Sequence, residues 1–143
     1  MYTISKLFEF EAAHILTDSY SVECQSIHGH SYKFEVIIRN NVLNKDGMVI
    51  DFKKLKEIVQ KEIVDKFDHK FILRDKHKGV SSCIPGCVFV SYNPTAENMA
   101  KDFHSSIAPF IQKECPGAIE LSIKLWETRT GCAQYTGGFN EGK

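Results

Sequence analysis

Three histidines constrain the fold of this chain more than any other feature. His28 and His30 begin an alternating run that reaches Arg39, and His14 ends an earlier alternating run that begins at Tyr2. Side chains on a β-strand repeat with period two, so His28 and His30 face the same side. His14 shares the parity of the apolar residues before it, which are Ile4, Phe8, Phe10 and Ala12. If the two runs pair as a hairpin, all three imidazoles meet at one rim, on the side that faces the core.

This arrangement predicts a zinc site. Three histidine ligands with an open fourth position are the usual pattern of catalytic zinc. The competing interpretation, that the histidines lie in loops and bond to backbone groups, does not explain why three of them share core parity at one rim. Three neutral imidazoles would leave zinc its full charge, so that it could act as a Lewis acid on a bound hydroxyl.

The remaining patterns predict two helices. Asp51 is placed to cap the first, whose apolar residues run at i, i+3 and i+4 spacing to Phe67. Thr95 is placed to cap the second. Pro109 should kink or interrupt that helix, and Pro116-Gly117 should end it.

Further strands are predicted at 119–126 and 132–136, with a short edge strand at 88–92. The expected fold is therefore α+β, in the order ββααββ, with a four-stranded antiparallel sheet and two helices on one face. At 143 residues the chain is expected to form a single domain over 1–143.

Charge and cysteine content narrow the classes of function. The 18 basic and 18 acidic residues cancel without a basic block, so we expect neither a nucleic-acid nor a membrane partner. Five cysteines at irregular spacing fit reduced thiols, which makes the cytoplasm the expected location. Cys83 and Cys87 lie in or beside a polar loop, where inert thiols are a better interpretation than a metal site.

Four other residues carry possible chemistry, each with a structural alternative. Cys24, four residues before His28, fits a buried thiol, a fourth metal ligand or a thiolate base equally well. Asp68-His69 is either a helix terminus or a carboxylate–imidazole pair for proton transfer. Glu127 continues an apolar parity, so its carboxylate needs a partner with adjacent N–H donors, such as a guanidine-like edge.

Six motifs, in order along nearly the whole chain, resemble one known family. They are Phe10-Glu11-Ala12-Ala13-His14, Cys24-Gln25-Ser26-Ile27-His28-Gly29-His30, Asp51-Phe52, Asp68-His69, Pro94-Thr95-Ala96-Glu97-Asn98 and Trp126-Glu127-Thr128. Together they resemble the 6-pyruvoyl-tetrahydropterin synthase superfamily, and they are most similar to its bacterial-type 6-carboxy-tetrahydropterin synthases of the queuosine (7-deazaguanine) pathway.

The resemblance implies a fold, an assembly and roles for these residues. It implies the tunnelling fold, in which sheets of several subunits join into a barrel, and a homohexamer of two trimers with active sites between subunits. By position it implies zinc ligation by His14, His28 and His30, with Cys24 as the catalytic base. Asp68 and His69 would complete the proton relay from a neighbouring subunit, Glu127 would grip the pterin's amino-pyrimidine edge, and Thr95 would contact the same ring through its backbone.

The implied substrate is 7,8-dihydroneopterin triphosphate, and the implied products are 6-carboxy-tetrahydropterin, acetaldehyde and triphosphate. A 6-pyruvoyl-tetrahydropterin synthase, which keeps the side-chain carbons, is the nearest alternative. The short interval between Cys24 and His28 favours the carboxy type. A non-catalytic module that binds zinc or pterin is a further alternative. Two departures from the family pattern are a longer segment at 74–92 and the lack of an evident basic cluster for the triphosphate.

Overall fold

The first two strands form the long hairpin that the sequence predicts. The structure, a computed structural model, describes residues 1–16, 21–75 and 84–139. β1 (Tyr2–His14) pairs with β2 (His28–Asn40) in one antiparallel register, from Tyr2 opposite Asn40 to His14 opposite His28. Burial alternates along both strands. Lys6 interrupts the apolar parity of β1, and its ammonium lies over the rings of Phe8 and Phe52, at 5.9 and 6.0 Å from their centroids.

Two more strands complete an antiparallel core to the sheet. β5 (Ala118–Trp126) pairs with β2, and β6 (Cys132–Gly137) pairs with β5, both antiparallel. The pairings among these four strands are antiparallel, as the sequence predicts, within a sheet that is mixed as a whole.

The predicted count of four strands is wrong, because the sheet has six in the order β4-β3-β1-β2-β5-β6. β3 (Lys70–Arg74) joins β1 in parallel, and β4 (Cys87–Val90) joins β3 in parallel at the edge. β4 confirms the predicted edge strand to within two residues. Alternation of polar and apolar residues does not mark β3, because its successive residues Phe71, Ile72 and Leu73 are all apolar and buried.

The helical segments are close to those predicted. α2 (Phe52–Val59), the π-helical turn η1 (Gln60–Val64) and α3 (Asp65–Phe67) follow one another, and α4 (Ala96–Glu114) is the longest. Asp51 Oδ1 accepts from the Lys53 N–H at 2.7 Å, and Thr95 Oγ1 accepts from the Asn98 N–H at 3.3 Å, which confirms both caps. A four-residue helix, α1 (Val22–Gln25), lies where the sequence indicates only a polar loop.

Pro109 lies inside α4, so of the predicted kink or interruption, the interruption is wrong. Its own side chain is exposed, while Ile107, Ala108 and Ile111 around it are buried. Packing of these residues outweighs the loss of one backbone hydrogen bond, so the helix continues to Glu114.

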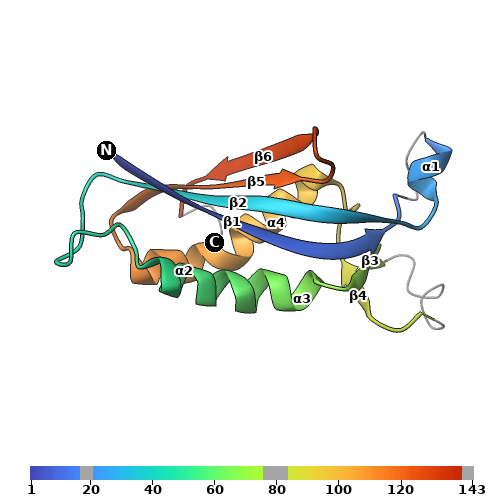
Figure 1. Ribbon diagram of the computed structural model, residues 1–143, viewed down its shortest axis with the longest axis horizontal. Coiled ribbons are helices and arrows are strands. Elements are labelled where there is room, and N and C mark those ends of the chain that lie inside the picture. Colours follow the sequence, from blue (N-terminus) through green and yellow to red (C-terminus); the bar gives the residue numbers. More distant parts are fainter. Residues whose placement is uncertain (17–20, 76–83, 140–143) are drawn as a thin grey trace.

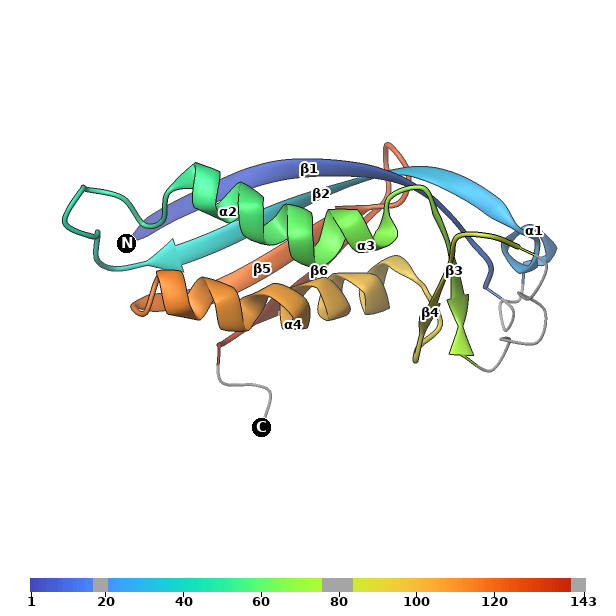
Figure 2. The ribbon, with the colours of Figure 1, turned by 90° about the horizontal axis from the view of Figure 1, so that it is seen from below.

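The two helical runs cover one face of the sheet, as predicted (Figures 1 and 2). The hydrophobic core lies between the sheet and the helices, where residues of β1, β2 and β5 meet α2, η1 and α4. The histidine ends of β1 and β2 point toward α1, at the right of Figure 1.

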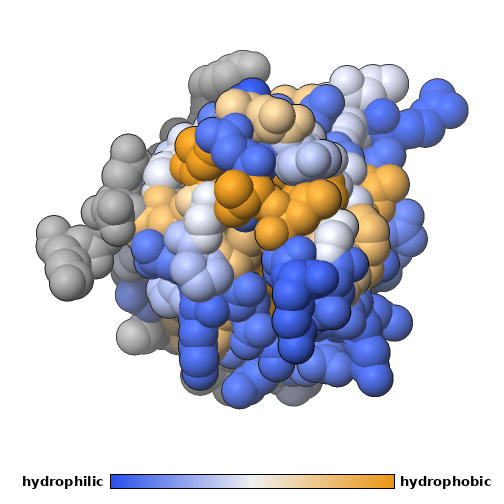
Figure 3. Space-filling model, turned by 90° about the vertical axis from the view of Figure 1, so that its left-hand side faces the viewer, coloured by the Kyte–Doolittle hydropathy of each residue, from blue (hydrophilic) through white to orange (hydrophobic). Residues whose placement is uncertain are grey.

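The opposite end of the molecule carries several exposed apolar side chains. Hydrophobic side chains gather on the face seen in Figure 3, and residues near the N-terminus and in the loop before α2 line a cavity of about 350 Å³ there. This cavity lies far along the sheet from the histidines. None of the helices within the described ranges is both long enough and apolar enough to cross a bilayer.

Candidate active site

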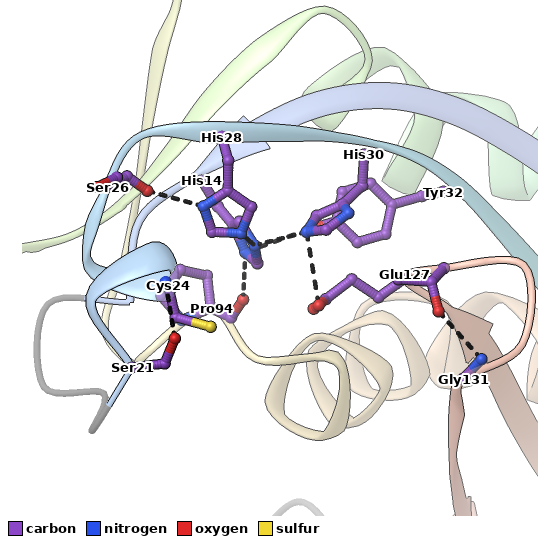
Figure 4. A network of polar contacts seen from close by, with 11 residues as sticks. His14, Ser21, Cys24, Ser26, His28, His30, Tyr32, Pro94, Glu127 and Gly131 are labelled. Carbon is purple, nitrogen blue, oxygen red and sulfur yellow. Dashed lines mark hydrogen bonds and ion pairs between the residues drawn. The ribbon is translucent and has the colours of Figure 1, made fainter.

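The hairpin register brings the three histidines together. His14 is the last residue of β1 and stands directly opposite His28, the first residue of β2. His30 follows two residues later, on the same face. His14 is fully buried, whereas His28 and His30 are half-buried. Figure 4 shows the three rings turned toward one another at the rim of the sheet.

The three Nε2 atoms converge. His14 Nε2 lies 2.9 Å from His28 Nε2 and 3.1 Å from His30 Nε2. His14 Nδ1 lies 2.8 Å from the Pro94 carbonyl oxygen, and His28 Nδ1 lies 2.7 Å from that of Ser26. A carbonyl only accepts, so both Nδ1 atoms donate their hydrogen and both Nε2 atoms present a lone pair.

This donor set suits a metal ion. Lone pairs that face one another at such distances repel, and a cation between them would remove the repulsion. Each of the three histidines offers one possible ligand atom, and these atoms all lie within 4.8 Å of one another. Among the described residues, no other group of three or more His, Cys, Asp or Glu ligand atoms is found this close together. Burial lowers the pKa of His14 to about 4, against the opposing effect of its bond to Pro94. Burial and the neighbouring His28 also lower the pKa of His30, so both pKa shifts favour the neutral ring, the form that a metal ligand requires.

Cys24 lies beside this group on α1. The Leu16 N–H donates to the Cys24 carbonyl at 2.8 Å, and the Cys24 N–H faces the N-cap oxygen of Ser21 at 3.5 Å. The thiol is half-buried, and Figure 4 shows its sulfur near Pro94, below the imidazoles. Within the described residues, Cys24 Sγ is not part of the group of ligand atoms that converge. This geometry favours a thiol beside the metal position over a fourth ligand.

Glu127 and Thr95 line one cavity next to the histidines. Glu127 directly follows β5, and its Oε1 lies 3.5 Å from His30 Nε2. Both residues, with Glu97 and Cys132, line a cavity of about 330 Å³. Burial raises the pKa of the Glu127 carboxyl; His28 acts against this shift, and Glu97 adds to it. The sequence indicates Glu97 only as the acidic residue of a first helical turn; its position two residues after Thr95 was the one available signal.

Asp68 and His69 form a polar pair at a different place. Asp68 Oδ1 lies 2.9 Å from His69 Nδ1 and accepts from the Glu11 N–H at 3.0 Å. The His69 N–H donates to the Glu11 carbonyl at 2.6 Å, so both backbone groups of one β1 residue hold the pair. The hydrogen bond from Glu11 and the His69 ring lower the pKa of Asp68.

His69 also has an unusual backbone. Its φ of 58° lies in the left-handed region, and its side chain is 79% exposed. It lines a cavity of about 590 Å³ together with His30 and with residues of the parity opposite to the three histidines, among them Glu11, Ala13, Gly29 and Ser31. Within one chain, the structure therefore does not bring Asp68 and His69 into the cavity of Glu127.

The two remaining cysteine predictions lie in the 74–92 segment. Cys83 lies outside the described residues. Cys87 is half-buried at the start of β4, and its Sγ donates to the Ile84 carbonyl at 3.2 Å. That contact fits the prediction of an inert thiol at Cys87.

Known proteins are similar to this chain over most of its length. The family model for 6-pyruvoyl tetrahydropterin synthase matches residues 3–138. A 6-carboxy-5,6,7,8-tetrahydropterin synthase of Rickettsia conorii is 35% identical over 135 residues, which cover 90% of this chain and 95% of the relative. The protein of the same name in Haemophilus influenzae is 36% identical over 145 residues, which cover 94% of this chain and 99% of the relative.

Solved structures share the fold. An uncharacterized protein from Wolinella succinogenes superposes with a TM-score of 0.79 at 22% identity, covering 94% of this chain and 97% of its own. A Plasmodium falciparum 6-pyruvoyl tetrahydropterin synthase gives a TM-score of 0.73 at 20% identity, covering 95% and 98%. With the family model spanning nearly the whole chain, the chain belongs to the 6-pyruvoyl tetrahydropterin synthase family.

Proposed function

We propose that the chain is a zinc-dependent 6-carboxy-5,6,7,8-tetrahydropterin synthase of queuosine biosynthesis. The reaction converts 7,8-dihydroneopterin triphosphate into 6-carboxy-tetrahydropterin, acetaldehyde and triphosphate, and one water molecule supplies the third oxygen of the two carbon products. The convergence of three histidine Nε2 atoms beside a carboxylate-lined cavity carries the proposal. The relatives at 35% and 36% identity with this name support the carboxy type. We place the reaction in the cytoplasm, which suits the reduced thiols.

His14, His28 and His30 would hold the zinc ion. Backbone carbonyls accept the Nδ1 hydrogens of His14 and His28, so the Nε2 lone pairs of these two rings already face each other. A bound zinc ion supplies Lewis acidity that makes the side-chain hydroxyls of the substrate more acidic. Three protein ligands leave a coordination position for those hydroxyls.

Cys24 would act as the base that removes a side-chain proton. Hydrogen bonds of its backbone carbonyl and N–H hold its position on α1. A thiol near a cation is more easily ionised, and a base in hydrogen-bond reach of the reacting carbon is what proton abstraction requires.

Glu127 would grip the pterin ring. A half-buried carboxylate needs donors, and the adjacent N–H groups of an amino-pyrimidine edge supply two of them. Thr95, at the N-cap of α4 in the same cavity, would contact the ring through its backbone. This placement puts the substrate side chain next to the histidines, because Glu127 Oε1 is 3.5 Å from His30 Nε2.

Asp68 and His69 would serve the active site of a neighbouring subunit, in a homohexamer of two trimers. In its own chain His69 lines a different cavity from Glu127, and its exposed ring is available to a partner. Asp68 would set the tautomer of His69, which would then manage the second proton transfer.

Complementation tests this sharing. Cys24→Ala and His69→Ala should each be nearly inactive alone. Mixed hexamers reassembled from both variants should regain activity, because some sites then combine an intact Cys24 with an intact His69. Mixtures that stay inactive, with reassembly shown by differently tagged subunits, would contradict it.

Product analysis separates this function from its two alternatives. The zinc-loaded protein is incubated anaerobically with 7,8-dihydroneopterin triphosphate, and the products are identified by mass spectrometry. Acetaldehyde with a 6-carboxy pterin is expected. A pyruvoyl product would instead support the 6-pyruvoyl-tetrahydropterin synthase. Pterin binding without turnover would support the non-catalytic module and would sink both enzyme functions.

A further inference from the structure

The proposed reaction leaves one polar group at the histidines unused, the hydroxyl of Tyr32. Tyr32 follows His30 by two residues on β2 and is 1% exposed. Its ring stacks on that of Phe10, directly opposite on β1, with 4.8 Å between centroids and 8° between planes. Close packing on both sides fixes the position of the ring and therefore of the hydroxyl oxygen.

That hydroxyl contacts the most buried of the three histidines. Tyr32 Oη lies 3.2 Å from His14 Nδ1, and the Tyr32 ring meets the His14 and His30 rings edge-on, at 6.1 and 5.5 Å between centroids. The Pro94 carbonyl oxygen lies 2.8 Å from the same His14 nitrogen. Two oxygen atoms, one from β2 and one from the segment before α4, therefore face one ring nitrogen.

Counting hydrogens decides which way these bonds run. A neutral imidazole carries one ring hydrogen, and the Pro94 carbonyl only accepts, so His14 Nδ1 carries it. Tyr32 Oη is then a second, longer acceptor of the same hydrogen. The opposite arrangement, with Tyr32 donating to a bare Nδ1, would leave the Pro94 oxygen against a nitrogen lone pair at 2.8 Å.

We propose that Tyr32 is a positioning residue of the metal site, which holds the His14 ring from a second side so that its Nε2 lone pair faces those of His28 and His30. The inference rests on the proposed zinc site. The Pro94 oxygen alone selects the tautomer, and the hydroxyl adds a second hydrogen-bond acceptor from β2 at the same ring nitrogen. Groups that orient a ligand in this way typically change metal affinity 10- to 100-fold, and the contact of 3.2 Å is long, so we expect about tenfold.

The test is Tyr32→Phe, which keeps the stacked ring and removes only the hydroxyl. Zinc affinity is measured by competition with a chromophoric chelator, and the visible spectrum of the cobalt-substituted protein reports ligand geometry. Tyr92→Phe is the matched control, because it removes a half-buried hydroxyl that donates to Asp102 Oδ2 at 2.6 Å. We expect zinc binding about tenfold weaker and a shifted cobalt spectrum in Tyr32→Phe, and neither change in Tyr92→Phe.

The outcomes are distinguishable. A purely structural role would lower the melting temperature of metal-free Tyr32→Phe while zinc affinity and the cobalt spectrum stay as in the wild type, and this would overturn the inference. A wild-type protein that binds no zinc would overturn the metal site itself. Should Tyr32→Phe not fold, nitrogen NMR of the wild type still tests the arrangement: the His14 hydrogen is expected on Nδ1, and finding it on Nε2 would refute a hydroxyl that accepts from that atom.

Discussion

Replacing Cys24 with alanine separates the two roles that its position next to the histidines allows. Alanine keeps the backbone bonds that hold α1, from the Leu16 N–H to residue 24 and from residue 24 to Ser21. The thiol is only half-buried, so its loss should lower the free energy of unfolding by about 1 kcal/mol or less. Because the three Nε2 atoms converge without the thiol, zinc affinity should change by less than about threefold.

Turnover should respond very differently. A positioned general base contributes about 10²- to 10⁴-fold to rate, which corresponds to roughly 3 to 5 kcal/mol of transition-state stabilisation. Cys24→Ala should therefore lose at least about 99% of its acetaldehyde production while it binds stoichiometric zinc. The expected drop in rate greatly exceeds the expected change in stability.

The assay combines three measurements on the same preparation: zinc content by elemental analysis, zinc affinity by chelator competition, and acetaldehyde release under anaerobic conditions. Cys87→Ala is the matched control, because its thiol is also half-buried but bonds to the Ile84 carbonyl away from the histidines. Zinc binding weakened more than tenfold in Cys24→Ala would refute the reasoning and make Cys24 a ligand. Full turnover would place the base elsewhere.

Four further outcomes are expected. Glu127→Gln should raise KM for the pterin about 10- to 100-fold at unchanged zinc content, by loss of a charge-assisted hydrogen bond, as steady-state kinetics would show. Asp68→Asn should keep the melting temperature, since its amide oxygen still accepts from the Glu11 N–H, but lower kcat roughly 10²- to 10⁴-fold because His69 loses its carboxylate. Zinc at 100 times its Kd should stabilise the chelator-treated protein by about 2.7 kcal/mol, or roughly 5–10 °C in a thermal melt. Phe103→Ala should cost about 3–5 kcal/mol in denaturant unfolding, because this fully buried ring packs against three other phenylalanine rings at 5.1–5.8 Å.

Parts of the fold that depend on local patterns were predictable. Alternation marked β1, β2 and β5, and capping residues Asp51 and Thr95 marked the starts of α2 and α4. β3 was not predictable from alternation, because it is buried on both sides and pairs in parallel with a strand far away in sequence. Pro109 indicated a break that packing on both sides of it prevents.

The candidate site divides in the same way. The meeting of His14, His28 and His30 follows from period-two geometry and one hairpin, which are properties of neighbouring segments. The position of Asp68 and His69, outside that group, does not follow from neighbouring segments. It depends on where α3 ends and on two hydrogen bonds to the backbone of Glu11.

The sequence by itself therefore determined which residues share the core face of the hairpin, and with them the set of possible zinc ligands. Only the tertiary structure decided how those ligands are oriented. The Pro94 carbonyl that selects the His14 tautomer is 80 residues away along the chain, and it reaches the ring only because α4 packs on the sheet. Hydrogen bonds act over about 3 Å and depend on direction, so such contacts exist only once the distant segments are packed.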